Sequence, residues 1–491
     1  MEIVWRFDPN YNAAKQIANA RFDYLHPAVI CFCESDDDVR EAMRMAKKEG
    51  LYVRIRSGGH HHEGMCSGPN VLMIDVSRIN TIRVEGDTVR LGPGARLGKV
   101  YPALWKAGQL FPGGGCGDVC VGGLVQGGGW GPYGRSLGFT CDRLIWFRIV
   151  KADGSILEVS NSPTDPNREL FWAVCGGGGG NFGVITEFLF RPGTLTTPIW
   201  SFTAKWQDPG LVEAVIDDWR GHFPGKADPR LTSFARLSAV QGDSPDPPAI
   251  VAGFFVGERS DLERIAPLLL PKTHAAAKFC YDQVDKTTES ADPRAFQHPE
   301  YQPGPPAAAV RALAAFTDVP PDVDLNSTCA GIPYPHKISS CFPQAGFGAD
   351  AIKAIATYLD RSSASSTVRR YLSLHSLGGA MERTNDQSCF PYRDKPFMLQ
   401  YQAWWADSND MQLQMECLAW IAGFRETLQP WTEGAFINFP DRDLVQFPND
   451  DTRRKELLRY YYAGNLERLI TVKATYDPDN FFNFEMGIPT S

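Results

Sequence analysis

The sequence predicts an α+β fold of two domains, and three observations lead to this. The chain has 491 residues, sufficient for roughly two to four domains. Strand and helix signals alternate over residues 1–200, and after a break with prolines at residues 192–198 the glycine density falls as far as about Pro430. Hydrophobic residues make up 43% and charged residues 22%, so a globular protein with a sizeable core is expected.

The first elements follow from apolar patterning and helix capping. Residues 26–34 are mostly apolar, which predicts a strand. Ser35 then offers an N-cap, acidic residues fill the first turn, and apolar residues recur at helical spacing as far as Gly50, which predicts a helix. Similar signals predict strands at residues 51–55, 71–76, 88–91 and 250–256 and helices at residues 97–106, 211–219 and 450–460.

Charge and hydropathy argue against several kinds of partner. The formal net charge is −8 and the chain has no long basic run, so no nucleic acid is expected. No apolar stretch reaches the ~18 residues of a membrane span, and residues 1–7 do not resemble a secretory signal, so a cytoplasmic protein without a membrane partner is expected. The twelve cysteines form no zinc-type pairs, so most should be reduced and buried.

Glycine is clustered in three segments, at residues 58–64, 113–129 and 176–183. Without a Cβ, backbone N–H groups can approach a pyrophosphate or a flat ring closely. No segment continues into the Gly-Lys-Ser/Thr of a P-loop, and none fits the Rossmann fingerprint with an acid ~20 residues further on. The pattern therefore predicts a large cofactor that extended backbone holds in some other way.

Five segments, in order along the chain, resemble the motifs of one flavoprotein family. Arg56-Ser57-Gly58-Gly59-His60 resembles the flavin-attachment loop of the vanillyl-alcohol oxidase superfamily. Cys116, followed by Val119, Gly122, Gly123 and Gly127, resembles the second attachment site of berberine-bridge-enzyme-like oxidases. Further similar positions are Asp142, residues 176–185 with Asn181, Phe182, Gly183 and Val184, Asn438 in Asn-Phe-Pro-Asp, and Tyr462, Asn465 and Asp477 near the C-terminus.

This resemblance implies FAD with two covalent links, one through His60 and one through Cys116. A histidine ring nitrogen can bond to the flavin 8α-methyl group, and a thiolate can bond to ring carbon C6. The two positions lie on one edge of the isoalloxazine, so two short loops can reach them together. The other matching positions named above are then expected to contact the cofactor.

The resemblance also implies the domain arrangement. Residues 1–198 and 431–491 would form a discontinuous FAD-binding domain. Residues 199–430 would form a substrate-binding domain, with an antiparallel sheet backed by helices. The flavin should lie at the seam between them, where pockets usually form.

The implied reaction is the oxidation of an alcohol group on a sugar or a secondary metabolite. A hydride would pass to flavin N5, and O₂ would be reduced to H₂O₂. Val119, three residues after the attachment cysteine, is small and predicts open access for O₂. Three alternatives stay open: an oxidative cyclase or desaturase of a secondary metabolite, a dehydrogenase with poor O₂ reactivity, and a flavin-loaded binding protein without turnover. The oligomeric state is not predicted.

The catalytic base is where the chain departs from its relatives. Their tyrosine and their acid correspond here to Phe439 and Ala406, neither of which accepts a proton. His375 has a suitable intrinsic pKa, and Tyr371 lies four residues earlier on the same strand face, so both are candidates. Gln400 and Gln402 share one face at strand period, which predicts a polar substrate wall that includes Gln402 as a site residue.

The run His60-His61-His62 suggests a metal site at first sight. Adjacent residues on an extended loop point in different directions, so three consecutive histidines rarely bind one ion. No metal is therefore expected, and His61 and His62 are interpreted as ordinary loop residues.

Overall fold

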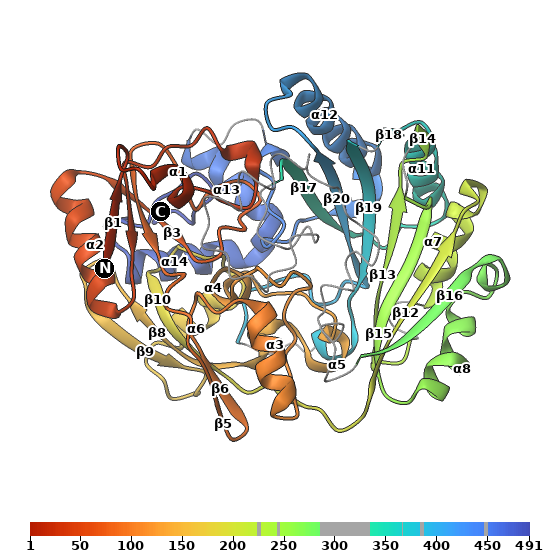
Figure 1. The fold of residues 1–491 in the computed structure, drawn as a ribbon, viewed down its shortest axis with the longest axis horizontal. Helices are drawn as coiled ribbons and strands as arrows, with labels where there is room; N and C mark the ends of the chain where they lie inside the picture. Colours follow the sequence, from red (N-terminus) through yellow and green to blue (C-terminus); the bar gives the residue numbers. More distant parts are fainter. Residues whose placement is uncertain (223–226, 243–245, 285–333, 366, 383–386, 446–449) are drawn as a thin grey trace.

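The computed structural model describes residues 1–222, 227–242, 246–284, 334–365, 367–382, 387–445 and 450–491. Cys329 lies outside these residues, and the eleven described cysteines form no disulfide with one another. Helices and mixed and antiparallel sheets are combined, which confirms the α+β class. The chain termini lie in the same half of the molecule, and a large sheet forms the other half (Figure 1).

The N-terminal sheet has four strands in the order β1-β2-β4-β3. Strands β2 and β3 both run parallel to β4, and β1 is antiparallel to β2. Helix α2 buries one apolar face against this sheet. The bounds are β1 Glu2–Trp5, α1 Tyr11–Ala14, β2 Val29–Phe32, α2 Asp36–Glu49, β3 Tyr52–Arg56 and β4 Val71–Asp75.

A second, antiparallel sheet has the order β5-β6-β10-β8-β9. Helices and a two-stranded ribbon of β7 and β11 connect and cover it. The bounds are β5 Ile82–Glu85, β6 Thr88–Leu91, α3 Leu97–Lys106, β7 Gln109–Leu110, α4 Val121–Gln126, α5 Gly134–Leu137, β8 Leu144–Val150, β9 Ile156–Ser160, α6 Arg168–Val174, β10 Val184–Phe190, β11 Gly193–Thr194, α13 Asp451–Tyr462 and α14 Leu466–Tyr476.

The large sheet has eight antiparallel strands in the order β16-β12-β15-β13-β19-β20-β17-β21. Its helices gather on the outer face, away from the other two sheets (Figure 1). The bounds are β12 Ile199–Trp206, α7 Val212–His222, β13 Leu231–Ser238, β14 Gln241–Gly242, β15 Ala249–Val256, α8 Arg259–Leu269, β16 Lys278–Val284, β17 His336–Pro343, α11 Ala349–Asp360, β18 Ser363–Ala364, β19 Val368–Ser376, β20 Phe397–Trp405, α12 Met411–Leu428 and β21 Thr432–Glu433.

Side-chain alternation gives the two faces of the large sheet different roles. Along β20, Leu399, Tyr401 and Ala403 pack into an apolar core with the outer helices. Gln400 and Gln402 point to the opposite face and line a cavity. The predicted polar wall on this strand is therefore present.

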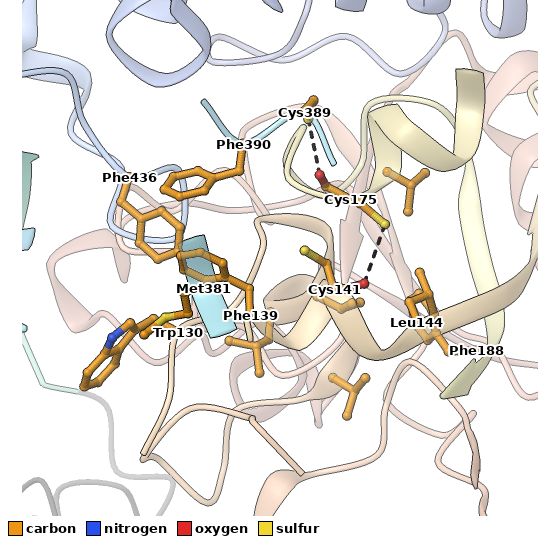
Figure 2. Close-up of a cluster of buried hydrophobic side chains, with 14 of the residues drawn as sticks. Trp130, Phe139, Cys141, Leu144, Cys175, Phe188, Met381, Cys389, Phe390 and Phe436 are labelled. Atoms are coloured by element: carbon orange, nitrogen blue, oxygen red, sulfur yellow. Dashed lines mark hydrogen bonds between the residues drawn. The ribbon is translucent and has the colours of Figure 1, made fainter. Parts of the chain in front are cut away.

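A second core lies on the side of the glycine-rich segments. Figure 2 shows Trp130 and Phe436 in it, near three buried cysteines, where Cys389 Sγ lies 3.4 Å from the carbonyl oxygen of Cys175. Burial raises the pKa of the Cys389 thiol well above its usual value, so this cysteine is apolar filling rather than a reactive group. Trp130 and Phe436 also line the cavity, so this core forms part of its floor.

The elements predicted from the sequence are all present; the strand at residues 88–91 and the helix at residues 97–106 have the predicted ends, and the others are shifted. Ser35 accepts a hydrogen bond from Asp38 N at 3.2 Å, and Gly50 ends α2 with a φ of 64°. The strand expected at residues 26–34 is shorter, Val29–Phe32. The domain division at residues 198 and 430 stays a prediction; the large sheet begins at Ile199 and ends at Glu433.

Candidate active site

A deep cavity lies between the inner face of the large sheet and the glycine-rich segments. Eleven glycines line it, contributed by all three predicted clusters. The predicted site residues that line it are Ser57, Gly58, Gly59, His60, Cys116, Val119, Gly122, Gly123, Gly127, Asn181, Gly183, Tyr371, His375, Gln402, Asn438 and Tyr462. The fold thus brings together segments more than 400 residues apart.

His60 and Cys116 lie on two loops that contact each other. A Cβ on Gly58 would approach Cys120 N to 3.0 Å, so only glycine allows this approach without a shift. Gly59 has a φ of 72°, which also favours glycine and turns the chain into His60. Burial lowers the pKa of His60 to about 4, so its imidazole is neutral near pH 7 and can act as a nucleophile.

The glycines also leave space for a large planar group. A Cβ on Gly123 would meet no other protein atom within 4 Å and would project into free space. Gly127 is different, because a Cβ there would lie 2.3 Å from Asn438 Oδ1. Gly123 therefore leaves room in the cavity, whereas Gly127 is needed to admit Asn438, which donates to Leu124 O at 3.2 Å. This cradle, with a thiol and an imidazole at its wall, fits an FAD with two attachment points.

Five predicted cofactor contacts do not line the cavity, namely Arg56, Asp142, Phe182, Val184 and Asn465. Phe182 and Val184 are buried in apolar cores. Asn465 donates a hydrogen bond to Cys389 O at 2.9 Å. The predicted cofactor contacts of these three residues stay predictions.

Arg56 and Asp142 hold loops in place from behind the cavity. Arg56 forms a buried ion pair with Asp75 and donates to Ala14 O at 2.7 Å, which attaches the N-terminal segment to the attachment loop. Asp142 accepts a hydrogen bond from Phe139 N at 2.9 Å and pairs with Arg393 at 2.5 Å. In the structure these two residues support the loops that line the cavity, and their predicted contact with the cofactor stays a prediction.

The polar wall is a continuous hydrogen-bond chain across β19 and β20. The indole of Trp404 can only donate, and it donates to Gln402 Oε1 at 3.0 Å. Tyr371 donates to the same oxygen at 2.8 Å, and Gln402 Nε2 donates to Gln400 Oε1 at 2.8 Å. The orientation of both amides therefore follows from one donor-only group.

This series of hydrogen bonds determines the tautomer of His375. His375 Nε2 lies 2.9 Å from Gln400 Oε1, an acceptor, so Nε2 carries the proton. Its Nδ1 is buried and has no hydrogen-bond partner among the described residues, and the ring packs against Trp130 at 4.5 Å between centroids. Burial lowers the pKa of His375 to about 4. As the ring lies, neither nitrogen can accept a proton from a molecule in the cavity, which argues against His375 as the base.

His62 and His336, which the sequence did not single out as site residues, face each other in the cavity. His62 Nδ1 lies 2.9 Å from His336 Nε2, and the ring of His62 packs against Phe439 at 6.0 Å. The two histidines are 274 positions apart, so no local pattern could join them. The run His60-His61-His62 beside the attachment histidine was the signal available in the sequence.

Several classes of group are absent from the part of the chain that the structure describes. No Asp or Glu side chain lines the cavity there. No set of three or more His, Cys, Asp or Glu side chains in those residues is arranged to hold a metal ion. None of the described helices has both the length and the apolar character needed to cross a membrane.

Comparison with known proteins gives consistent matches over the whole chain. A family model for an FAD binding domain matches residues 27–160, and one named "Berberine and berberine like" matches residues 435–489. An uncharacterised FAD-linked oxidoreductase of Bacillus subtilis is 31% identical and is covered to 96%, over 99% of this chain. The aclacinomycin-N/aclacinomycin-A oxidase of Streptomyces galilaeus is 29% identical, over 94% of this chain and 85% of its own.

Solved structures of the same shape include a sugar oxidase. The glucooligosaccharide oxidase of Acremonium strictum superimposes with a TM-score of 0.81 at 23% identity, covering 100% of this chain and 96% of its own. At this level of identity the likeness concerns the fold, and it agrees with the arrangement of sheets described above.

Proposed function

Because the chain belongs to the berberine-bridge-enzyme-like family of FAD-linked oxidoreductases, we propose that it is an oxidase with FAD attached through His60 and Cys116. Its substrate is an alcohol group of a sugar or a secondary metabolite. The observation that carries the proposal is that His60 and Cys116 both line one glycine-walled cavity that a polar wall closes on the far side. The bound FAD would supply the chemistry by accepting a hydride at N5 and passing the electron pair to O₂, with H₂O₂ as product.

The residues of the chain bind and orient the substrate. Gln400 uses its oxygen for His375 and Gln402, so its NH₂ group remains as a donor towards the cavity. Tyr371 and Gln402 hold this amide in place through the hydrogen bonds of the wall. A substrate hydroxyl would accept from Gln400 and lie against Gln402, while Phe439 and Trp130 exclude water from the reacting carbon.

The covalent links can be tested by acid precipitation. The precipitated wild-type protein should stay yellow, because bonds to His60 and Cys116 survive denaturation. His60→Ala and Cys116→Ala should each keep one link, and the double variant should release its FAD into the supernatant. A colourless precipitate from the wild type would refute the bicovalent attachment.

The reaction class can be tested by anaerobic mixing with alcohols. Cellobiose, D-glucose and benzyl alcohol are suitable probes, and bleaching of the flavin absorbance reports its reduction. Subsequent air should restore the yellow colour and yield H₂O₂ in equal amount. Bleaching without recovery in air would instead indicate a dehydrogenase, and a ring-closed or desaturated product from a secondary metabolite would indicate the alternative oxidative chemistry.

A further inference from the structure

The side chains that line the cavity leave few groups able to accept a proton. Tyr462 donates its hydroxyl proton to Gly177 O at 2.7 Å, and burial raises its pKa well above the usual value. Burial likewise raises the pKa of Cys66 to about 11 and of Cys120 to about 12. Since the described lining contains no carboxylate, an imidazole is the remaining class of base at neutral pH.

Two of the cavity imidazoles have no lone pair open to a bound molecule. His61 Nδ1 accepts hydrogen bonds from Glu63 N at 3.2 Å and Met65 N at 3.5 Å, so its lone pair is in use. His375 donates through Nε2, and its Nδ1 is enclosed by protein atoms. His60 is assigned to the flavin link, so His62 and His336 remain.

The hydrogen bonds of His336 determine the tautomers of both rings. His336 Nδ1 lies 2.9 Å from the carbonyl oxygen of Tyr334, which only accepts, so His336 is protonated at Nδ1. Its Nε2 is then an acceptor, and the proton between the rings belongs to His62 Nδ1. The lone pair of His62 therefore lies on Nε2. This atom makes no hydrogen bond to a described residue and is not enclosed by protein atoms.

Polar contacts from outside the two rings hold the segments of His62 and His336 together. Asn19, which is buried, donates from Nδ2 to His62 O at 2.8 Å and to His336 O at 3.0 Å, and accepts from His336 N at 3.1 Å. Immediately after each histidine, Glu63 and Lys337 form a buried ion pair at 2.7 Å. The relative position of the two imidazoles is thus specified by four polar contacts from outside the rings.

We propose that His62 is the catalytic base, accepting the hydroxyl proton of the bound alcohol at Nε2, with His336 as the residue that positions it. The inference rests on the proposed function, which supplies both the alcohol and FAD. The O–H bond of the alcohol breaks and an N–H bond forms at His62, while the hydride leaves the carbinol carbon with its electron pair for FAD. His336 Nε2 accepts the His62 Nδ1–H throughout, so the ring stays oriented as it becomes cationic.

The electrostatic surroundings keep the pair in its base form. Burial lowers the pKa of His62 well below 6.5, and His336, His61, His60 and Arg21 further disfavour a charge on it. Burial lowers the pKa of His336 to about 3. The neighbouring charges are compensated within one cluster, where Lys337 pairs with Glu63, Asp441 and Asp443, and Arg21 pairs with Glu63. The rate of flavin reduction should therefore be constant above pH 6.5 and fall at lower pH, as His62 becomes protonated.

The kinetic test uses the flavin-loaded enzyme and whichever of cellobiose or benzyl alcohol reduces it. His62→Ala should slow anaerobic reduction by ~10²–10⁴-fold, the usual contribution of a positioned base, and should lose the acid limb of the pH profile. Added imidazole should restore part of the rate. His336→Gln keeps an acceptor for His62 Nδ1 and should retain most of the activity that His336→Leu loses.

Controls separate this inference from folding and from the proposed function. His274→Gln removes an imidazole outside the cavity lining and should leave the rate unchanged. Reoxidation by O₂ after photochemical reduction should be the same in wild type and His62→Ala. If the wild type is reduced and His62→Ala is reduced as fast, the base assignment is overturned while the proposed function stands.

A second measurement does not depend on turnover. In the holoenzyme with ¹⁵N-labelled histidine, the His62 signals, assigned by their loss in His62→Ala, should show a protonated Nδ1 and an unprotonated Nε2 at pH 7.5. A protonated Nε2 would overturn the inference even if neither alcohol reduces the flavin, a result that would count separately against the proposed substrate class.

Discussion

At the scale of single residues, His375 shows that the intrinsic pKa of a side chain does not by itself identify a base. The sequence favours it because a free imidazole titrates near neutral pH. In the fold, Gln400 fixes its tautomer, and protein atoms enclose its Nδ1. No local pattern marks His62 as a base, yet Asn19 fixes its backbone and His336 its tautomer. Partners, rather than residue type, determine which imidazole can work as a base.

A second residue-scale question is how O₂ reaches the reduced flavin. Val119 lines the cavity three residues after Cys116 and is only partly buried. The larger Val119→Leu side chain should fill the access path and slow reoxidation by roughly tenfold or more, a barrier increase of ~1.4 kcal/mol, with anaerobic reduction unchanged. Val119→Ala should not slow it. Stopped-flow mixing of the reduced enzyme with O₂ measures the reoxidation rate of each variant. Equal rates in wild type and Val119→Leu would contradict the role of Val119 in O₂ access.

At the scale of elements, local chemistry predicts where an element ends and which face is polar, whereas the register between two strands cannot be predicted from it. The ends of α2 can be predicted from the sequence because Ser35 and Gly50 cap the helix through hydrogen bonds to residues a few positions away. The polar face of β20 can be predicted because the alternation of side chains between two faces is a property of the strand alone. The pairing of Tyr371 with Gln402 across β19 and β20 depends on register between strands, which the sequence does not contain.

Helix α4 offers a direct test of the glycine cradle, because its two central glycines have opposite surroundings. Gly123→Leu should place its side chain in the cavity and strongly reduce the FAD content of the purified protein. Fold stability should not fall, because replacing a helical glycine favours the helix by up to ~1 kcal/mol.

The matched controls for this test lie in α4 itself and in α7. Gly221→Leu replaces a helical glycine that also has open space around it but lies outside the cavity lining, so FAD content should stay normal. Gly122→Ala should instead destabilise the fold, because its Cβ would lie 2.9 Å from Pro93 O. Flavin absorbance per protein and thermal unfolding separate these results. Full FAD content in Gly123→Leu would show that the cofactor does not occupy this space.

At the scale of the whole molecule, the site depends on distant segments that meet behind it. Lys337 on β17 pairs with Glu63 at 2.7 Å and with Asp441 at 2.5 Å, and all three side chains are buried. Arg21 pairs with the same Glu63 at 2.8 Å. This cluster joins the N-terminal region, the loop after His60, the large sheet and the C-terminal segment. Sequence reasoning could not find it, because its members are separated by up to 420 positions and no local pattern pairs Asp441 of the Asn-Phe-Pro-Asp element with Lys337.

Removing the central charge of this cluster should therefore weaken the whole fold. Lys337→Met removes the cation that pairs with buried Asp441 and leaves Glu63 with Arg21 alone, and breaking a buried pair typically costs ~3–5 kcal/mol. The urea midpoint of the holoenzyme should fall clearly, while Lys353→Met, an exposed lysine on α11, should leave it unchanged. Asp443→Asn should cost less than ~1 kcal/mol, because that partner of Lys337 is 57% exposed and solvent screens the pair. Equal midpoints for Lys337→Met and Lys353→Met would show that the buried ion pairs do not hold the segments together, and that Asn19 and the apolar cores position the two histidines without them.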